Sequence, residues 1–544
     1  MSGKTGYKVT MNFPAPNKFS PETQQGRDFL GQQSIIQSMT YECLPSFTNA
    51  TIKLRHYSFW AWAFKILKKN FKNIKQEDQL PYLWKLETAL IIANRMRDPD
   101  YKGMPGVLGV DFPDVDSPDT YEVPIFFDKK NRASSYEPVQ YSPSIGTLNI
   151  VKRDGHDYQI LKYGIKLGAL FDETISKCEG YKELIDPKQK TLSVKHLKCL
   201  GEALSLENIS KTEEDIFLEI IEQDELNRGQ ENGLTKRIQT TCMLLEIIQK
   251  HDITNTENIL SPLWNVNYKC NKKLVSITSA WQIIRARQFF HLSVESFLSS
   301  FCLYLEIHES RTGNIKDYCK RFIEDIPSRS IGKIHLKEIQ DLIARNATFK
   351  ELTEFLYEIC VENEINEETI MGLIVKLKLV VSKAYVFNNT FQFALLGLTL
   401  QILLNKRYPE LQKLSGKMAE KFFKVPRNYR LSFVRIQNIF EKVMNKKIDA
   451  ALEILFMEFM LKLHLGVSQD KWIQTGNFTF RFVRDENGGY RMQHNVGIKA
   501  PNTTGNKLSA YLSLLKYAGF WELDPNKKMV LTSSGSAYLK SQFE

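Results

Sequence analysis

The sequence lacks the features that would place it among disulfide-stabilised or membrane-spanning proteins. Its eight cysteines include no Cys-x-x-Cys pair, and several fall inside apolar helical patterns, so we expect buried thiols in a reducing compartment. No stretch approaches the roughly 18 uncharged apolar residues that a spanning helix needs, and the first residues contain no apolar segment typical of a signal peptide. These absences predict a cytoplasmic location and no membrane partner.

Signatures of catalysis and of metal or cofactor binding are also scarce. The Gly-Lys-Thr at residues 3–5 lacks the upstream glycine and the following helix of a phosphate-binding loop. No Cys/His cluster has zinc spacing, and HExxH does not occur. Clustered carboxylates suit divalent cations, but prolines interrupt the acidic run here and favour a solvated loop; the run comprises Asp111, Asp114, Asp116, Asp119 and Glu122. We expect no cofactor and no metal, and we favour binding over catalysis.

The length and composition predict a multidomain globular protein. The chain has 544 residues, of which 43% are apolar and 25% charged, and about 150 residues per domain is usual. Repeated amphipathic patterns with few strand signals predict a mainly α fold with small β-hairpins (α+β), a helical scaffold with winged-helix-like units. We expect an N-terminal helical domain over 1–175, an acidic helical middle domain over 176–400, and a basic C-terminal part over 401–544.

Local signals predict individual elements. Residues 51–72 repeat apolar side chains at spacings of three and four, which predicts a core-facing helix, the alternative being an aromatic platform for bases. A long buried helix is predicted over 276–307. Asp154-Gly155 and Asn487-Gly488-Gly489 each separate two short apolar runs, as in hairpin turns. We expect a helix over 162–175 and a long Pro- and Gly-rich loop over 98–144.

The net charge of +11 is concentrated near the C-terminal end. Residues 401–544 hold 23 Lys/Arg against 12 Asp/Glu, and the preceding 400 residues are neutral overall. Basic charge gathered on one domain raises the local potential for phosphate groups, although a solvated basic face with no ligand has the same composition. One stretch contains only one carboxylate, Glu420, beside six cations: Lys417, Lys421, Lys424, Arg427, Arg430 and Arg435.

The segment 503–544 contains the most specific pattern in the chain. A predicted helix over 503–520 precedes two short strands, FWEL and KMVLT, and SSGSAYLKSQF closes the chain as a helix. From Leu515 to Gly535 the segment resembles the winged-helix signature Leu-x-x-Ala-Gly-aromatic, wing, Leu-Thr-x-x-Gly. The resemblance implies a recognition helix in the major groove of DNA and a wing on the phosphates. The side chains offered would be Asn506 and Lys507 on the helix, with Lys527 and Lys528 on the wing.

Two further considerations bear on this winged-helix hypothesis. No arginine on the candidate recognition helix would pair with guanine, so we expect weak sequence specificity. Winged helices also dock proteins, and that alternative stays open. A weaker echo of the pattern lies at 141–172, with Lys152, Arg153 and His156 near its hairpin tip. Two such units around a helical middle are similar to the kleisin-type partners of chromosome-organising ATPases, so an adaptor that docks an ATPase is a second hypothesis.

A third hypothesis is a nucleic-acid-cleaving effector. Arg285 and His291 have the Arg-x5-His spacing of helical ribonucleases of the HEPN kind, in which the arginine would stabilise phosphate charge and the histidine would act in acid–base chemistry. The resemblance covers two residues only, and Ala286 occupies the place where a polar residue often follows the arginine.

The N-terminal region resembles uncharacterised bacterial proteins from anti-phage defence islands. The resemblance is carried by Leu44-Pro45, Thr48 to Thr51 and Leu54 to Phe59, with Ser46 at the usual glycine place. It implies a cellular context, antiviral defence, and no settled chemistry. Our leading hypothesis is a DNA-binding or DNA-sensing subunit of a multi-protein bacterial system, which contacts duplex DNA while a protein partner supplies the enzymatic activity.

Overall fold

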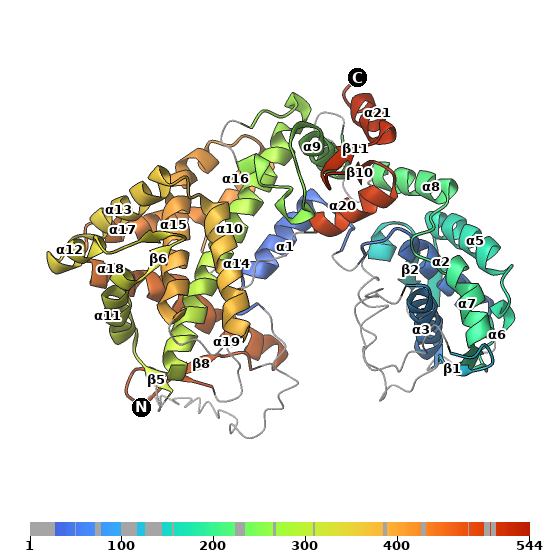
Figure 1. The fold of residues 1–544 in the computed structure, drawn as a ribbon, viewed down its shortest axis with the longest axis horizontal. Helices are drawn as coiled ribbons and strands as arrows, with labels where there is room; N and C mark the ends of the chain where they lie inside the picture. The colour runs from blue at the N-terminus through green and yellow to red at the C-terminus, as the bar shows by residue number, and fades with distance from the viewer. Residues whose placement is uncertain are drawn as a thin grey trace, which may run out of the picture. The chain divides into compact units, whose positions relative to one another are not determined.

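The protein is mainly helical with small antiparallel sheets, as the sequence predicts (Figure 1). This computed structural model describes residues 28–48, 51–70, 78–98, 117–125, 144–154, 157–223, 234–264, 268–307, 311–383, 389–425, 431–476, 478–493, 501 and 507–544. None of the helices in these ranges combines the length and hydrophobicity that crossing a bilayer requires. All eight cysteines are free thiols and five of them are buried, which confirms the prediction for most of them.

The chain forms two compact units, each assembled from separate stretches of sequence. Unit 1 comprises residues 1–36, 283–414 and 420–504, and unit 2 comprises residues 37–282, 415–419 and 505–544. The domain boundaries expected near 175 and 400 fall inside units 2 and 1, because long-range packing rather than chain order defines the units. Most of the basic stretch lies in unit 1, whereas the C-terminal hairpin lies in unit 2.

Unit 1 is organised around α15 (Thr390–Gln412), which is buried on most sides and contacts α11, α13, α14 and α17. Helices α13, α15 and α17 lie side by side in Figure 1. The other elements are α11 (Ile315–Asp325), η8 (Ile326–Ser328), β6 (Ser330–Ile331), β7 (Ile334–His335), α12 (Ile339–Ala344), α13 (Phe349–Glu362), α14 (Glu367–Lys383), α17 (Phe433–Met444), α18 (Ile448–Phe456), the π-helical segment η10 (Met457–Leu461) and α19 (Lys462–Thr475).

Aromatic side chains far apart in the sequence form the core of unit 1. The ring of Tyr318 on α11 meets the rings of Phe301 and Phe456 edge-on, each at 5.2 Å between centroids. Phe301 belongs to α10 (Val275–Ile307), the long helix predicted over 276–307. Edge-to-face packing of this kind adds to the stabilisation from burial alone. The prediction that this helix is buried is therefore confirmed.

Unit 1 also contains the hairpin that the sequence predicts, with its turn at residues 487–489. Strands β8 (Phe482–Arg484) and β9 (Tyr490–Met492) pair antiparallel, and β9 also pairs with β5 (Thr312–Gly313). The turn is possible because Gly488 adopts a left-handed backbone with φ 79°.

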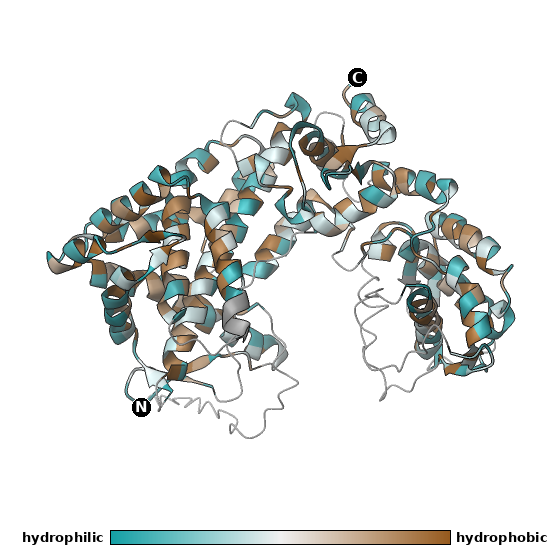
Figure 2. Cartoon of the chain, in the orientation of Figure 1, coloured by the Kyte–Doolittle hydropathy of each residue, from teal (hydrophilic) through white to brown (hydrophobic). Residues whose placement is uncertain are grey.

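Unit 2 packs α2 (Arg55–Lys69) against α5 (Lys162–Ile175), and α3 (Gln79–Arg97) against α7 (Val194–Ala203). Figure 2 shows hydrophobic residues concentrated along α3. The rings of Tyr57, Trp60 and Phe64 on α2 are buried, which confirms the core-facing interpretation. The remaining elements of this part are α6 (Tyr181–Ile185), α8 (Lys211–Glu222), α9 (Lys236–Lys250), η5 (Thr256–Asn258), η6 (Pro262–Trp264) and η7 (Lys272–Leu274). Helices α1 (Gln32–Cys43), α10 and α16 (Lys417–Lys424) each contain a boundary between the units.

The loop expected over 98–144 contains a strand that the sequence did not reveal. Strand β1 (Glu122–Pro124) pairs antiparallel with β4 (Thr191–Ser193). Three-residue strands are too short to show alternation, and 66 residues separate the two strands. Asp119 lies beside this pair and forms an ion pair with Lys198, while Asp111, Asp114 and Asp116 lie outside the described residues. Among the described residues, no cluster of His, Cys, Asp and Glu could hold a metal ion.

Two stretches of unit 2 share one helix–hairpin–helix arrangement, which we call the hairpin modules. The first module runs from the helical turn at 144–147 through β2 (Val151–Asp154) and β3 (Asp157–Ile160) into α5. The second runs from α20 (Leu508–Tyr517) through β10 (Trp521–Leu523) and β11 (Met529–Leu531) into α21 (Ser533–Ser541). The predicted order of elements is confirmed in both.

The backbone hydrogen bonds of the two modules correspond one to one. The N–H of Ile150 donates to the carbonyl oxygen of Ile145 at 3.0 Å, and the carbonyl oxygen of Ile150 accepts from the N–H of Leu161 at 2.9 Å. Phe520 repeats both bonds in the second module, donating to Leu515 O at 3.0 Å and accepting from Thr532 N–H at 3.1 Å. The same local construction is therefore used twice in unit 2.

One glycine in each module lies three residues into the segment that follows the hairpin, after Leu161 in the first module and after Thr532 in the second. A Cβ at Gly164 would lie 2.1 Å from the carbonyl oxygen of Ile150, and a Cβ at Gly535 would lie 1.9 Å from that of Phe520. No side chain fits at such distances, so glycine allows the closing helix to pack directly against the backbone that precedes the hairpin.

Candidate nucleic-acid interface

Helix α16 presents three of the predicted lysines on one exposed face. Lys417, Lys421 and Lys424 are exposed, whereas Ala419, Phe422 and Phe423 are buried on the opposite side. Spacings of four and three residues bring side chains to the same face of a helix. The apolar residues between the lysines pack inward, so the exposed face holds three lysines and one carboxylate, Glu420.

The end of α16 is held by a buried arginine of α10. Arg287 is fully buried and donates from Nη2 to the carbonyl oxygen of Val425 and from Nη1 to that of Leu431, each at 2.7 Å. Its guanidinium also lies 4.1 Å from the centre of the Phe433 ring. Burial lowers the pKa of Arg287 to about 10, which leaves the side chain charged at neutral pH. Arg427 and Arg430 lie between these contacts, outside the described residues.

Helix α17 adds further exposed cations in unit 1. Ser432 caps the helix by accepting a hydrogen bond from the N–H of Arg435. The guanidinium of Arg435 lies 3.5 Å from Glu458, which also pairs with Lys462, so one carboxylate is shared by two cations. Sequence reasoning missed three exposed lysines of this region: Lys442, Lys446 and Lys447. Only Lys442 lies on α17, seven residues after Arg435, and that helical spacing is the signal that could have found it.

The charge excess belongs mainly to unit 1. Residues 420–504 hold 14 Lys/Arg and 8 Asp/Glu, whereas residues 505–544 hold 5 and 3. The C-terminal hairpin module therefore contributes little of the positive charge that the sequence places near the chain end.

Most of the candidate recognition helix, α20, is covered by other parts of unit 2. The hydroxyl of Tyr511 hydrogen-bonds Thr241 on α9 at 2.7 Å, and that of Ser509 hydrogen-bonds Thr256 in η5, also at 2.7 Å. Lys507 is partly buried, with its ammonium 4.8 Å from the centre of the Tyr41 ring, and burial lowers its pKa. Asn506 lies outside the described residues. Little of the described helix remains available for the major groove.

The candidate wing is anchored to the segment that follows α9. Lys528 forms an ion pair with Asp252 at 2.7 Å, which raises the pKa of the lysine. The next residue, Met529, donates its N–H to the carbonyl oxygen of Ile253 at 2.7 Å. Lys527 is exposed at the turn with φ 62°. Of the two lysines predicted to contact phosphate, one is already neutralised by a carboxylate.

The low-ranked catalytic candidates are both buried on α10. Arg285 is 5% exposed and pairs with Glu368, its Nε lying 2.9 Å from Oε1, while Nη1 donates to Gln288 at 3.1 Å. His291 is 3% exposed, with Nε2 3.4 Å from a carboxylate oxygen of Glu295. Each side chain faces a neighbouring carboxylate inside unit 1.

Residues of the N-terminal pattern pack inside unit 2 as an internal framework. Ser46, at the place where the resembled pattern has glycine, adopts a left-handed backbone with φ 76°. Its hydroxyl accepts a hydrogen bond from Nη2 of Arg237 at 3.1 Å, and Nη1 of the same arginine donates to Ile220 O at 2.5 Å. Arg237 is 1% exposed, so it ties the turn to α8 from within the core.

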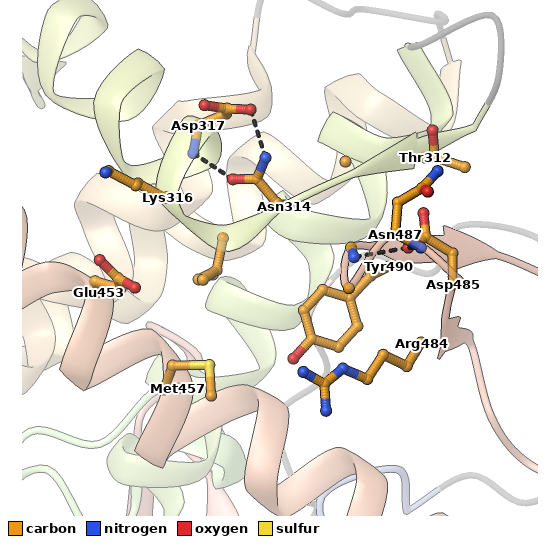
Figure 3. A pocket seen from close by; sticks show the side chains of 14 residues that line it. Thr312, Asn314, Lys316, Asp317, Glu453, Met457, Arg484, Asp485, Asn487 and Tyr490 are labelled. Atoms are coloured by element: carbon orange, nitrogen blue, oxygen red, sulfur yellow. Dashed lines mark hydrogen bonds between the residues drawn. The ribbon is translucent and has the colours of Figure 1, made fainter.

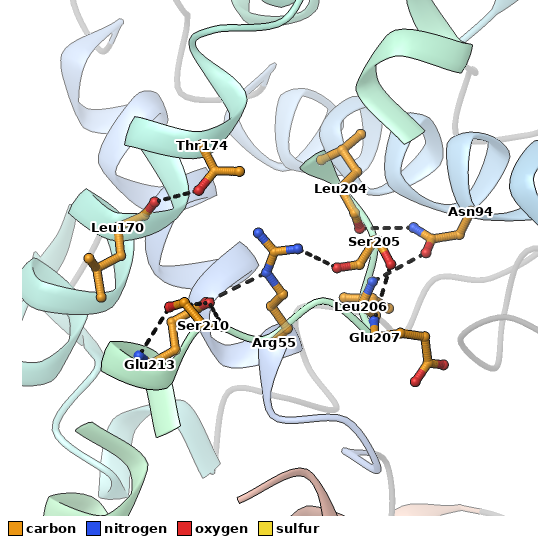
Figure 4. Close-up of polar contacts among 10 residues, drawn as sticks. All are labelled: Arg55, Asn94, Leu170, Thr174, Leu204, Ser205, Leu206, Glu207, Ser210 and Glu213. Carbon is orange, nitrogen blue, oxygen red and sulfur yellow. Dashed lines mark hydrogen bonds and ion pairs between the residues drawn. The ribbon is translucent and has the colours of Figure 1, made fainter. Parts of the chain in front are cut away.

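Arg55 plays the same structural part at the other end of the pattern. Figure 4 shows its guanidinium between the loop after α7 and the start of α8. Nη1 donates to the carbonyl oxygen of Ser205 at 2.5 Å, and Nε lies 3.6 Å from Glu213. Glu213 also completes the capping box of α8 with Ser210. Asn94 holds the same loop by hydrogen bonds to Leu204 and Leu206.

Comparisons with protein-family models, with curated proteins and with solved structures found no match to this chain.

Proposed function

We propose that this chain binds the phosphate backbone of nucleic acid, duplex DNA above all, through the exposed lysines of α16 and the neighbouring cations of α17. The observation that supports this most directly is the arrangement of Lys417, Lys421 and Lys424 along one face of α16. Seven residues of helix span about 10 Å, and duplex DNA presents one charge per about 1.7 Å of its axis. Such a face can neutralise several phosphates at once.

The type of side chain favours backbone contact over sequence readout. Lysine is a compact point charge, whereas bidentate recognition of base edges uses arginine, asparagine or glutamine. The partly buried Lys507 and the paired Lys528 also argue against a groove-reading role for the second hairpin module. Weak sequence specificity is therefore part of the proposal.

We assign the two hairpin modules, which we interpret as winged-helix-like, to docking within a multi-protein bacterial system. The supporting observation is that hydrogen bonds and an ion pair engage the polar groups of α20 and the wing inside unit 2. On this view the chain is the DNA-binding or DNA-sensing subunit, and a partner such as an ATPase supplies the chemistry.

The test is binding of the full chain to a fluorescent DNA duplex over a salt series. A phosphate-directed interaction weakens steeply with salt, with a log–log slope of about −0.9 per neutralised phosphate. Replacing Lys417, Lys421 and Lys424 by glutamine is expected to flatten the slope by about 2.7. A matched triple variant at Lys320, Lys333 and Lys337, which are exposed elsewhere in unit 1, should leave the slope unchanged. Absence of binding at low salt, or equal slopes for the two triple variants, would refute the proposal.

A further inference from the structure

Unit 1 contains a groove at the start of α11, apart from the basic face. Its volume is about 630 Å³, within the range of small-molecule sites. One wall is β5 with the first turn of α11, the second is the hairpin turn at 485–489, and the third is α18 with η10. Figure 3 shows the side chains that line it. Met457 opens the π-helical segment, a geometry that is frequent at functional sites.

Tyr490 places an unsatisfied polar group in this groove. The residue is 8% exposed, and its ring packs edge-on against Phe301 at 5.8 Å and Phe482 at 5.6 Å. Its hydroxyl has no hydrogen-bond partner in the part of the chain that the structure describes, and it points into the groove toward Met457 (Figure 3). The hydroxyl is reached from the groove rather than fully buried, so it can donate a hydrogen bond to a ligand that enters there.

Two cations, Arg484 and Lys316, line the groove together with three carboxylates. Arg484 is exposed beside the Tyr490 hydroxyl and forms no ion pair within the described ranges, and its charge opposes the rise in the pKa of Tyr490 that burial causes. Helix α11 begins at Ile315, and its first N–H groups have no acceptor inside the helix. The positive end of the helix dipole faces the same space. Lys316 lines the groove as well.

Two of the three carboxylates that line the groove are already engaged in local turns. Asp485 accepts hydrogen bonds from the N–H groups of Asn487 at 3.1 Å and Gly489 at 2.7 Å. Asp317 accepts one from the Asn314 side chain at 2.5 Å. The third carboxylate, Glu453, lies across the groove from Tyr490 in Figure 3. The groove thus offers donors on one side and an acceptor on the other.

We propose that this groove binds a small molecule that carries an oxyanion, phosphate or carboxylate, on one end and a hydrogen-bond donor on the other. The oxyanion accepts from the Tyr490 hydroxyl and pairs with Arg484, while Glu453 accepts from the donor. A nucleoside monophosphate and an amino acid both have this chemistry. The inference does not depend on nucleic-acid binding, because it rests on different residues.

The test is titration calorimetry of the full chain with four probes: inorganic phosphate, acetate, adenosine monophosphate and glutamine. At least one probe is expected to bind at millimolar concentration or below. Tyr490→Phe keeps the packed ring and removes only the hydroxyl, and Arg484→Gln removes an exposed charge. Each is expected to weaken binding about tenfold, the usual effect of losing a hydrogen bond or ion pair to a charged ligand. Preference for adenosine monophosphate over glutamine, or the reverse, identifies the source of the oxyanion.

A matched control lies on the same hairpin. Arg491 is exposed and follows Tyr490 on β9, so its side chain points to the other face of the strand, and Arg491→Gln should bind as the wild type does. Glu453→Gln is expected to tighten inorganic phosphate, because a like charge is removed, and to weaken the two probes that carry a donor. Binding by none of the probes, or unchanged binding in both Tyr490→Phe and Arg484→Gln, would overturn the inference. Equal effects of Glu453→Gln on all probes would overturn the role of Glu453.

Discussion

Units 1 and 2 differ in where they place positively charged side chains. In unit 2, Arg55 and Arg237 are buried and donate to carbonyl oxygens, and Lys528 of the hairpin is paired with a carboxylate. Unit 1 also buries Arg287 for the same structural purpose, yet it keeps exposed lysines along α16 and α17. Net charge along a sequence therefore does not reveal which charges a partner can reach; the packing of each side chain decides that.

The hairpins of the two units show the same contrast. In unit 2 each hairpin is closed by a glycine that packs against a carbonyl, and the tip of the second is bonded to residues 252 and 253. In unit 1 the β8–β9 turn keeps its own carboxylate, Asp485, inside the turn and opens onto a groove. The hairpins of unit 2 are thus packed against other parts of their unit, whereas that of unit 1 borders the groove.

The largest effect is expected from Arg285→Ala in unit 1. The substitution leaves Glu368 without its partner, in a position where 19% of its side chain is exposed. Breaking a buried ion pair typically lowers the free energy of unfolding by about 3–5 kcal/mol. Urea unfolding with peptide-resolved proteolysis should locate the loss in unit 1. As a control, Lys350→Ala, which removes an exposed i,i+4 pair with Glu354, should cost less than about 1 kcal/mol. Nuclease activity that disappears without loss of stability would instead make Arg285 catalytic.

Gly164→Ala and Gly535→Ala should each destabilise unit 2 by about 3 kcal/mol or more, because the new methyl group overlaps a carbonyl oxygen. Gly372→Ala on α14 is the matched control in unit 1, since nothing lies within 4 Å of its added Cβ, and it should stabilise by up to about 1 kcal/mol. Amide hydrogen exchange, read separately for each unit, measures the stability change of all three variants. Wild-type protection in both unit 2 variants would show that the modules close in some other way.

Lowering the pH should reduce the stability of unit 1 through the buried side chain of His464. Its Nε2 accepts from the Arg481 N–H at 3.0 Å and its Nδ1 donates to Phe29 O at 3.3 Å, and burial, assisted by Arg481, lowers its pKa to about 3. Below pH 6.5 the unfolded chain binds a proton that the folded chain does not, so stability falls as pH falls. The loss at pH 5 is about 2 kcal/mol.

His464→Gln should remove this pH dependence from unit 1 while unit 2 keeps its own, because burial lowers the pKa of His56 to about 3 as well. Urea midpoints of both units at pH 7 and pH 5 are the measurement. An unchanged difference between the two pH values in unit 1 of the variant would contradict the assignment.

The smallest effect is expected from Asp252→Asn, which releases Lys528 from its ion pair. One additional lysine can steepen the salt slope of duplex binding by at most about 0.9. Asp215→Asn, another exposed carboxylate of unit 2, serves as the control. A much larger gain for Asp252→Asn would mean that the hairpin is the main DNA contact.

Elements with local signals were predictable from the sequence. The hairpins at 151–160 and 482–492 follow from glycine turns between apolar runs, and α10 follows from its periodic apolar residues. The repeat of the hairpin module was visible in the glycine that follows each hairpin. Strands β1 and β4 were not, because each has three residues and depends on pairing across the intervening helices.

Whether a candidate site residue is paired with another side chain was not predictable, because its partner is distant in sequence. Lys528 meets Asp252, and Arg237 meets Ser46, only after the fold is formed. The exposure of Lys417, Lys421 and Lys424 was implicit in their helical spacing, since the apolar residues between them pack inward while the charged Glu420 shares the exposed face. The groove at Tyr490 has no sequence motif, because three separate segments contribute to it.

The central claim, that α16 rather than the C-terminal hairpin contacts phosphate, is tested most directly by two matched double variants in one salt series with a DNA duplex. Lys421→Gln with Lys424→Gln removes two charges from α16, and Lys527→Gln with Lys528→Gln removes two from the C-terminal hairpin. We predict that the first pair flattens the log–log salt slope by about 1.8 and that the second leaves it unchanged. A flattened slope for the hairpin pair with a wild-type slope for the α16 pair would contradict the claim.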